Sequence, residues 1–157
     1  MLPTLYKNQY QIIQSPGYVV IHVEMAHDTR VIRISDTPLP SIIRPWPGDS
    51  LANWENNTLV VETSNLQPLL RFRNATKGFK IVERFTRVAK NRVNYDSKVN
   101  NSDTWAVPWS AEIAFSPIEN KPYQYACHEG NYSLPGILAG ARRGEANSQY
   151  GNSNLIT

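Results

Sequence analysis

Four carboxylates lie in segments where apolar and polar residues alternate. They are Glu24, Glu62, Glu83 and Glu112. A period of two is typical of β-strands, whose successive side chains point to opposite faces. If the strands pair in matching registers, all four acids project into one concave surface. A carboxylate buried there is costly unless a cation pairs with it, and one with a raised pKa suits general acid or base catalysis near neutral pH.

Arginines that can pair with these acids occur in the same segments: Arg30, Arg33, Arg84 and Arg87. Two interpretations stay open. In one, the charges line a pocket where Glu24 and His128 transfer protons. Arg30 and Arg84 then hold an anionic or carbonyl oxygen of the substrate. In the other, the charges form cross-strand ion pairs on the solvent face, each contributing a fraction of a kcal/mol.

The densest cluster of reactive side chains is the segment 125–132, YACHEGNY, where a strand gives way to a loop and a helix. His128 is a candidate proton carrier because the unperturbed pKa of histidine lies near neutrality, or else it ties the strand end to the helix. Cys127 points away from His128 on an extended strand, which favours a structural thiol over a nucleophile. The residues expected to contact a substrate are Tyr125, Trp109, Trp54, Glu62, Glu83 and Glu112.

A metal site has a weak basis in this sequence. His27, His128 and a carboxylate from Glu24 or Glu129 would give a two-histidine, one-carboxylate set if the first and last strands were neighbours. No H-x-H or HExxH spacing supports it, so we expect no metal. The sequence also lacks a nucleotide-binding glycine motif and a GxSxG motif, so we expect no cofactor.

The elements that must position these residues are mainly strands. Alternation and short polar turns predict three hairpins, formed by residues 17–26 with 30–34, 79–88 with 92–99, and 109–115 with 122–128. A further strand is expected over 58–63. Four prolines and a Gly-Asp pair make residues 35–50 a long, rigid loop, and Asp49 within it a turn or cap residue.

Helical periodicity occurs in one place, residues 134–146, where three glycines predict a short or frayed helix. We expect one β domain over residues 1–146 and a loosely ordered tail over 147–157. The expected fold is mainly β: an antiparallel meander that closes into a lipocalin-like (calycin-type) barrel or a curved sheet, with one short C-terminal helix.

The composition of the chain limits the classes of partner that we expect it to bind. The net charge is +3, but the sixteen Lys and Arg residues are scattered apart from a concentration at residues 71–80, which argues against nucleic-acid binding. One cysteine excludes an internal disulfide. We expect no signal peptide and no membrane association, because MLPTLYKNQY lacks a basic and an apolar region and no long apolar run occurs. An apolar strand face is consistent with either a covered core or a homodimer.

Five segments of the chain follow one another in the order of a longer sequence pattern: GYVVIHVEMAHDTRVI, RPWPGDSLANWENNTLVVETSN, VERFTR, WAVPWSAEI and YQYACHEGNYSLPGILAGAR. Together they resemble a family of largely uncharacterised, often secreted bacterial proteins with WEGDTLVVET and ACHEGNY motifs. The resemblance runs from about Gln14 to Arg143 and departs at Asn56-Asn57, where the family has Gly-Asp. It implies one β domain and, for the relatives, a secreted or periplasmic location, but no reaction. The residues on pattern positions are Glu24, His27, Arg30, Asp49, Trp54, Glu55, Glu62, Glu83, Arg84, Trp109, Glu112, His128 and Glu129.

The first functional hypothesis is a cofactor-independent acid/base enzyme, a lyase, isomerase or cyclase acting on a small, partly apolar molecule in the barrel. It follows from strand-borne acids and arginines without a nucleotide or nucleophile motif. The second is a non-catalytic module that binds a sugar or lipid in the same pocket. The third is a metal-dependent hydrolase or oxygenase. All three take a small-molecule partner.

Overall fold

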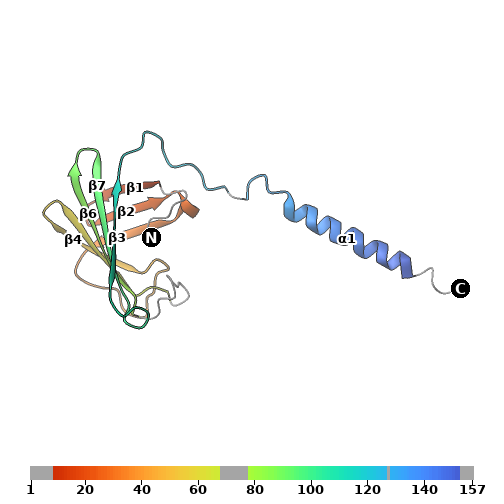
Figure 1. Cartoon of the computed structure of the whole chain (residues 1–157), viewed down its shortest axis with the longest axis horizontal. Coiled ribbons are helices and arrows are strands. Elements are labelled where there is room, and N and C mark those ends of the chain that lie inside the picture. Colours follow the sequence, from red (N-terminus) through yellow and green to blue (C-terminus); the bar gives the residue numbers. More distant parts are fainter. Residues whose placement is uncertain (1–8, 68–77, 127, 153–157) are drawn as a thin grey trace. The chain divides into compact units, whose positions relative to one another are not determined.

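The computed structural model of the protein describes residues 9–67, 78–126 and 128–152. The chain divides into two compact units, Met1–Gln124 and Tyr125–Thr157. The second unit holds the helix α1 (Ser133–Asn152), and the first holds a short 3-10 helix, η1 (Met25–His27), and all the strands of the described residues (Figure 1). The strands are β1 (Tyr10–Ser15), β2 (Tyr18–Val23), β3 (Thr29–Ile34), β4 (Asp49–Glu55), β5 (Thr58–Ser64), β6 (Lys80–Ala89), β7 (Arg92–Asn100) and β8 (Trp109–Phe115).

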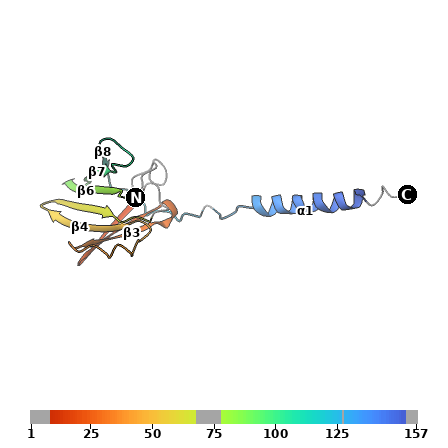
Figure 2. The ribbon, with the colours of Figure 1, turned by 90° about the horizontal axis from the view of Figure 1, so that it is seen from below.

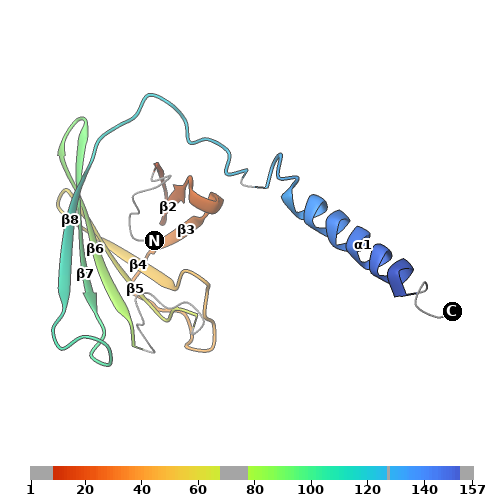
Figure 3. The ribbon, with the colours of Figure 1, turned by 45° about the vertical axis from the view of Figure 1, so that its right-hand side comes forward.

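The strands form one eight-stranded sheet in which each strand pairs with its neighbours in the sequence. All neighbouring pairs are antiparallel except β3 and β4, which are parallel. The sheet curls into a half-barrel, as Figures 1 and 3 show. The prediction of a mainly β, curved meander followed by a C-terminal helix is confirmed.

Short turns between alternating strands explain most of the pairing. The predicted hairpins β2–β3 and β6–β7 are present. The β4–β5 hairpin closes over Asn56-Asn57, with Glu55 opposite Thr58. Asn56 has a φ of 54° there, a left-handed conformation that asparagine tolerates better than most residues.

The parallel pair β3–β4 needs a crossover, because two parallel strands cannot be joined by a tight turn. The proline-rich segment 35–48 supplies it, and Figure 2 shows β3 and β4 side by side. The predicted loop over 35–50 is therefore correct up to Gly48, after which β4 begins. Asp49 is a buried strand residue and not a turn residue.

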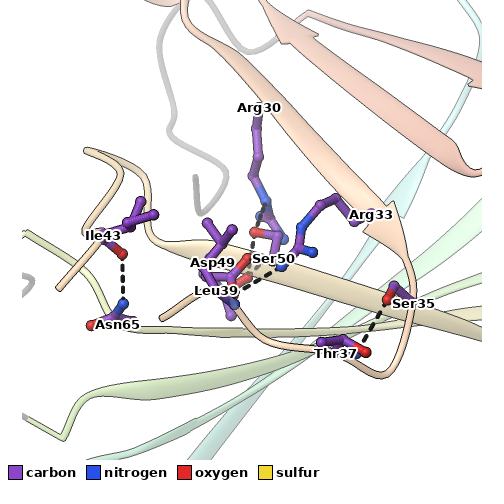
Figure 4. Close-up of polar contacts among 10 residues, drawn as sticks. Arg30, Arg33, Ser35, Thr37, Leu39, Ile43, Asp49, Ser50 and Asn65 are labelled. Carbon is purple, nitrogen blue, oxygen red and sulfur yellow. Dashed lines mark hydrogen bonds and ion pairs between the residues drawn. The ribbon is translucent and has the colours of Figure 1, made fainter. Parts of the chain in front are cut away.

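Asp49 ties the crossover to both strands (Figure 4). Its carboxylate accepts two hydrogen bonds from Nη2 of Arg33 on β3, at 2.8 and 3.1 Å. It also accepts one from the backbone N–H of Leu39 within the crossover, at 2.7 Å. One buried carboxylate thus links β3, β4 and the crossover between them.

The core lies on the concave face. Alternate residues of each strand point inward, and the most buried apolar side chains are Val19, Ile32, Val61, Tyr95 and Val99. The edge strands β1 and β8 meet through the rings of Tyr10 and Phe115, whose centroids lie 5.3 Å apart. Within the described residues, no backbone ladder joins β1 to β8.

Several expectations about individual elements are wrong. Strands β1 and most of β4 were not expected, because YQIIQS is rich in glutamine and the start of β4 follows the prolines directly. The strand expected over 122–128 is absent among its described residues, 122–126 and 128. Pro122 removes one ladder donor at the start of that segment, and Cys127 lies outside the described residues. The expected strand over 17–26 ends at Val23, before η1.

The helix α1 has 20 residues and is longer than expected. Pro135 lies in its first turn, where a missing N–H costs little, and no later proline interrupts it. The sheet and the helix fall in different units, so a single domain over 1–146 stays a prediction. No helix in the described part of the chain is long and apolar enough to cross a membrane.

Replacing Gly48 by Ala tests the close approach at the start of β4. Gly48 has a φ of +84°, and an added Cβ would lie 2.7 Å from the carbonyl oxygen of Ser64. We expect a loss of about 3–4 kcal/mol in the free energy of unfolding, from left-handed strain and overpacking together. Urea denaturation measures it.

Gly17→Ala is the matched control for this substitution. Gly17 also has a positive φ, +77°, but nothing lies within 4 Å of an added Cβ. Only the conformational cost applies there, about 1–2 kcal/mol. Equal losses for the two variants would contradict the packing at Gly48.

Candidate functional site

A buried ion pair lies at the centre of the half-barrel. Arg30 on β3 donates a hydrogen bond through Nη2 to Oε2 of Glu83 on β6, and their side chains are 2% and 1% exposed. Both face inward because each lies opposite an inward-facing apolar residue of the adjacent strand, Ile21 for Arg30 and Val61 for Glu83. The alternation that builds the core therefore also places these two charges inside it.

Neighbouring strands supply the other partners of the ion pair. Nε of Arg30 donates to Oγ of Ser50 at 3.0 Å, and Nη2 donates to Oγ1 of Thr63 at 3.0 Å. The hydroxyl of Tyr95 donates to Oε1 of Glu83 at 2.9 Å. The five residues come from β3, β4, β5, β6 and β7. This polar network therefore links five adjacent strands, and Figure 4 shows Arg30 reaching Ser50.

The surroundings fix the protonation states of Glu83 and Tyr95. Burial by itself raises the pKa of Glu83, but the positive charge of Arg30 and hydrogen bonds from Arg30 and Tyr95 outweigh it and keep this pKa below its usual value. Burial, with the negative charge of Glu83 beside it, raises the pKa of the Tyr95 hydroxyl. At neutral pH Glu83 is a carboxylate and Tyr95 is protonated. Neither group has the pKa near neutrality that acid/base catalysis favours.

A separate cavity of about 1120 Å³ occupies the concave face. Its apolar lining includes Ile12, Ile21, Leu59, Phe85 and Phe115. Because β1, β4 and β6 run in the same direction, the β1–β2, β4–β5 and β6–β7 turns lie at one end of the sheet. The cavity opens at that end. The turns Asn56-Asn57 and Lys90-Asn91 contribute to its mouth.

A layer of apolar side chains separates this cavity from the polar network. Phe85 and Phe115 line the large cavity and also a small one of about 10 Å³, whose other walls include Arg30, Glu83 and Tyr95. The ring of Tyr95 contacts both, with centroids 5.0 Å from Phe85 and 5.4 Å from Phe115. The small cavity has room for about one water molecule. A molecule in the large cavity would therefore meet rings and aliphatic groups, with the ion pair behind them.

Three predicted site residues lie on the outer face of the sheet. Glu62 pairs with Lys80 at 2.6 Å, and Arg84 pairs with Glu55 at 2.7 Å. Glu112 accepts a hydrogen bond from Asn94 at 3.2 Å. For Glu62 and Arg84 the interpretation as ion pairs on the solvent face is correct, whereas Glu112 lies on that face with a neutral partner. Of the four strand acids expected to share one concave surface, Glu83 is the one whose side chain enters it.

Glu24 and the histidines of the first unit lie away from the cavity. Glu24 is buried one residue beyond β2, and it is not among the residues that line the cavity. His22 exchanges a hydrogen bond with Oγ1 of Thr29 through Nδ1, at 2.9 Å, and stacks on His27 with centroids 6.3 Å apart. Glu24 therefore has no role in the network or the cavity lining.

The aromatic residues predicted to contact a substrate do not all line the cavity. Trp54 lines the mouth of the cavity. Trp109 packs edge-on against Trp105, with centroids 6.0 Å apart, and does not line the cavity. Tyr125, His128 and Glu129 belong to the second unit, so their roles with the half-barrel stay predictions.

The residues of the predicted metal site are likewise divided between the two units. His27 belongs to the first unit, and His128 and Glu129 to the second. Among the residues that the structure describes, no three His, Cys, Asp or Glu side chains are grouped closely enough to hold a metal ion.

Sequence reasoning missed three members of the network: Ser50, Thr63 and Tyr95. Tyr95 had a usable signal, because the hairpin of 79–88 with 92–99 puts it opposite Phe85 and on the face of Glu83. Ser50 and Thr63 had none. In an alternating strand, the sequence pattern around a serine or threonine is the same whether its hydroxyl faces solvent or a buried arginine.

Comparisons of the chain with protein-family models, with curated proteins and with solved structures find no match.

Glu83→Gln tests the stabilising role of the ion pair. The change leaves the charge of Arg30 buried without its counter-ion, and we expect a loss of about 3–5 kcal/mol in the free energy of unfolding at neutral pH. Glu62→Gln is the matched control, because Glu62 lies on the adjacent strand β5 in a half-exposed pair. It should lose less than about 1 kcal/mol. Urea denaturation of both variants measures the difference.

The pH dependence of the same variant follows from the lowered pKa of Glu83. The carboxylate binds a proton more readily in the unfolded chain, whose reference pKa is 4.5, than in the folded protein. Its stabilising contribution is complete above that pH and is lost as the pH falls through the lower, folded pKa. The stability gap between wild type and Glu83→Gln should stay constant above about pH 5 and shrink below it. A gap that widens on acidification would contradict the assignment.

Proposed function

We propose that the protein binds a small, partly apolar organic molecule in the concave face of its half-barrel, without transforming it. The observation that carries the proposal is the cavity of about 1120 Å³ with its aliphatic and aromatic lining. Pockets for small organic ligands typically measure roughly 300–1,000 Å³ and are mostly apolar with a few polar groups. The cavity is slightly larger than this range and has polar side chains at its mouth.

The polar network supports binding over acid/base catalysis. An acid/base enzyme needs a proton donor or acceptor within reach of the substrate and with a pKa near the working pH. Glu83 is ionised and paired, Tyr95 is protonated and bonded to it, and Phe85 and Phe115 separate both from the large cavity. The network is therefore suited to holding the strands that form the cavity.

Apolar burial would supply most of the affinity. Transfer of apolar surface from water contributes roughly 25 cal/mol per Å². The exposed concave-face residue Ile12, 42% exposed, would be covered by a ligand. A ligand would therefore stabilise the folded protein in proportion to the apolar area that it covers.

Filling the cavity tests this proposal. Val93 lines the cavity, opposite Phe115 on β8. The substitution Val93→Trp would put an indole ring into the space that we propose the ligand occupies. We expect affinity for the neutral probes dodecanol and naphthol, measured by calorimetry, to fall by about tenfold or more. Mass spectrometry of the incubated mixtures should show each probe unchanged.

Val88→Trp provides the matched control. Val88 lies on the same hairpin, is 51% exposed and does not line the cavity. This variant should bind the probes as the wild type does. If neither probe binds the wild-type protein, or if both variants lose binding equally, the concave face is not the binding site. A chemically altered probe would support an enzyme instead.

A further inference from the structure

The mouth of the cavity is positively charged. Its lining residues include four cations and a single carboxylate: Arg87, Lys90, Arg92, Lys121 and Glu119. The net charge of the whole chain is only +3, so much of its excess positive charge gathers around this opening. An uncompensated charge at the rim of a low-dielectric cavity attracts ligands of opposite sign.

None of the ion pairs among the described residues uses these four cations. Four other cations of the sheet, Arg30, Arg33, Lys80 and Arg84, are paired with carboxylates. Lys98 is not in these ion pairs either, but it is exposed and does not line the cavity. The distinguishing feature of the cations at the mouth is that their charges gather around one opening without a carboxylate partner in these ion pairs.

Arg87 is the best placed of the four. It lies on the inward face of β6, four residues after Glu83 and two after Phe85, so it follows the apolar lining towards the β6–β7 turn. Its Nε and Nη2 donate to the carbonyl oxygens of Ala89 and Lys90, at 3.5 and 3.2 Å. These neutral acceptors position the guanidinium at the β6–β7 turn and leave its charge available.

We infer that the ligand is a free anionic amphiphile, with a carboxylate, sulfate or phosphate group at Arg87 and Lys90 and an apolar body over Ile21, Leu59 and Phe115. This inference rests on the proposed binding function and adds the charge of the ligand to it. A charged group bound by guanidinium and ammonium donors forms charge-assisted hydrogen bonds, which are stronger than neutral ones. The neutral apolar lining cannot select the sign of the ligand, whereas the rim can.

Three probes of equal chain length test the inference: dodecanoate, dodecanol and dodecyltrimethylammonium. The two ionic probes are used below their micelle concentrations and dodecanol below its solubility limit. We expect the full-length protein to bind dodecanoate about tenfold more tightly than dodecanol, and the cation most weakly. Added salt should weaken dodecanoate binding and leave dodecanol binding unchanged, because salt screens the exposed rim. Calorimetric titration measures all three.

The double variant Arg87→Gln with Lys90→Gln should lose about tenfold in dodecanoate affinity and less than twofold in dodecanol affinity. The matched control is Arg44→Gln with Lys98→Gln. Both of these side chains are exposed, neither lines the cavity, and Arg44 also donates to a backbone carbonyl, that of Ser41 at 3.3 Å. The control removes the same total charge and should bind dodecanoate as the wild type does.

The outcomes separate the inference from the proposed function. Equal affinity for dodecanoate and dodecanol in the wild type would overturn the anionic ligand and leave the binding function in place. Equal loss in the rim variant and its control would overturn the role of Arg87 and Lys90. Binding to phosphatidylglycerol vesicles without binding of monomeric dodecanoate would overturn a free ligand. If neither dodecanoate nor dodecanol binds, both proposals are wrong.

Discussion

The buried contact between Arg30 and Glu83 constrains the rest of the half-barrel. An isolated charge in this interior would cost several kcal/mol, so each charge requires the other and both require the surrounding hydroxyls. The two residues and their three partners come from five adjacent strands, which means that the network is complete only when β3 to β7 are all in register. A strand that slipped by one residue would put its whole inward face outside. The ion pair thus contributes to specificity of the fold as well as to its stability.

The arrangement of the concave face follows from this constraint. The network occupies the centre of the sheet, rings of Phe85, Tyr95 and Phe115 cover it, and the cavity lies beyond them towards the turns. The lysines and arginines that line the cavity include Arg87, Lys90 and Arg92 at the β6–β7 turn. The protein therefore keeps the charges of the buried network and the charges that line the cavity in separate layers. A residue can be buried, ionised and highly constrained here without being part of a reaction.

The sequence predicted the fold better than the site. Alternation in residues 79–88 and 92–99 was strong enough to predict that hairpin, and the prolines predicted a loop after residue 34. That this loop is a crossover between parallel strands was not predicted. It could not predict which face of each strand is inside. Glu62, Glu83 and Glu112 have similar local patterns, yet only Glu83 faces inward, because facing depends on the register across the whole sheet. Strand β1 was missed because glutamines mask its alternation, and the cavity was missed because it belongs to no single segment.

The contact between Tyr10 and Phe115 joins the two edge strands of the sheet in a different way from the other strand pairs. A closed barrel has a circumference determined by its strand number and stagger, since a backbone ladder joins the last strand to the first. Here ring stacking joins them within the described residues, and stacked rings tolerate sliding and offset that a ladder does not. Within the described residues, the seam between β1 and β8 is therefore not fixed by backbone hydrogen bonds, whereas β2 to β7 each have a ladder on both sides. If a ligand binds on the concave face as we propose, movement at this seam would let the half-barrel take ligands of different widths without changing the register of any strand pair.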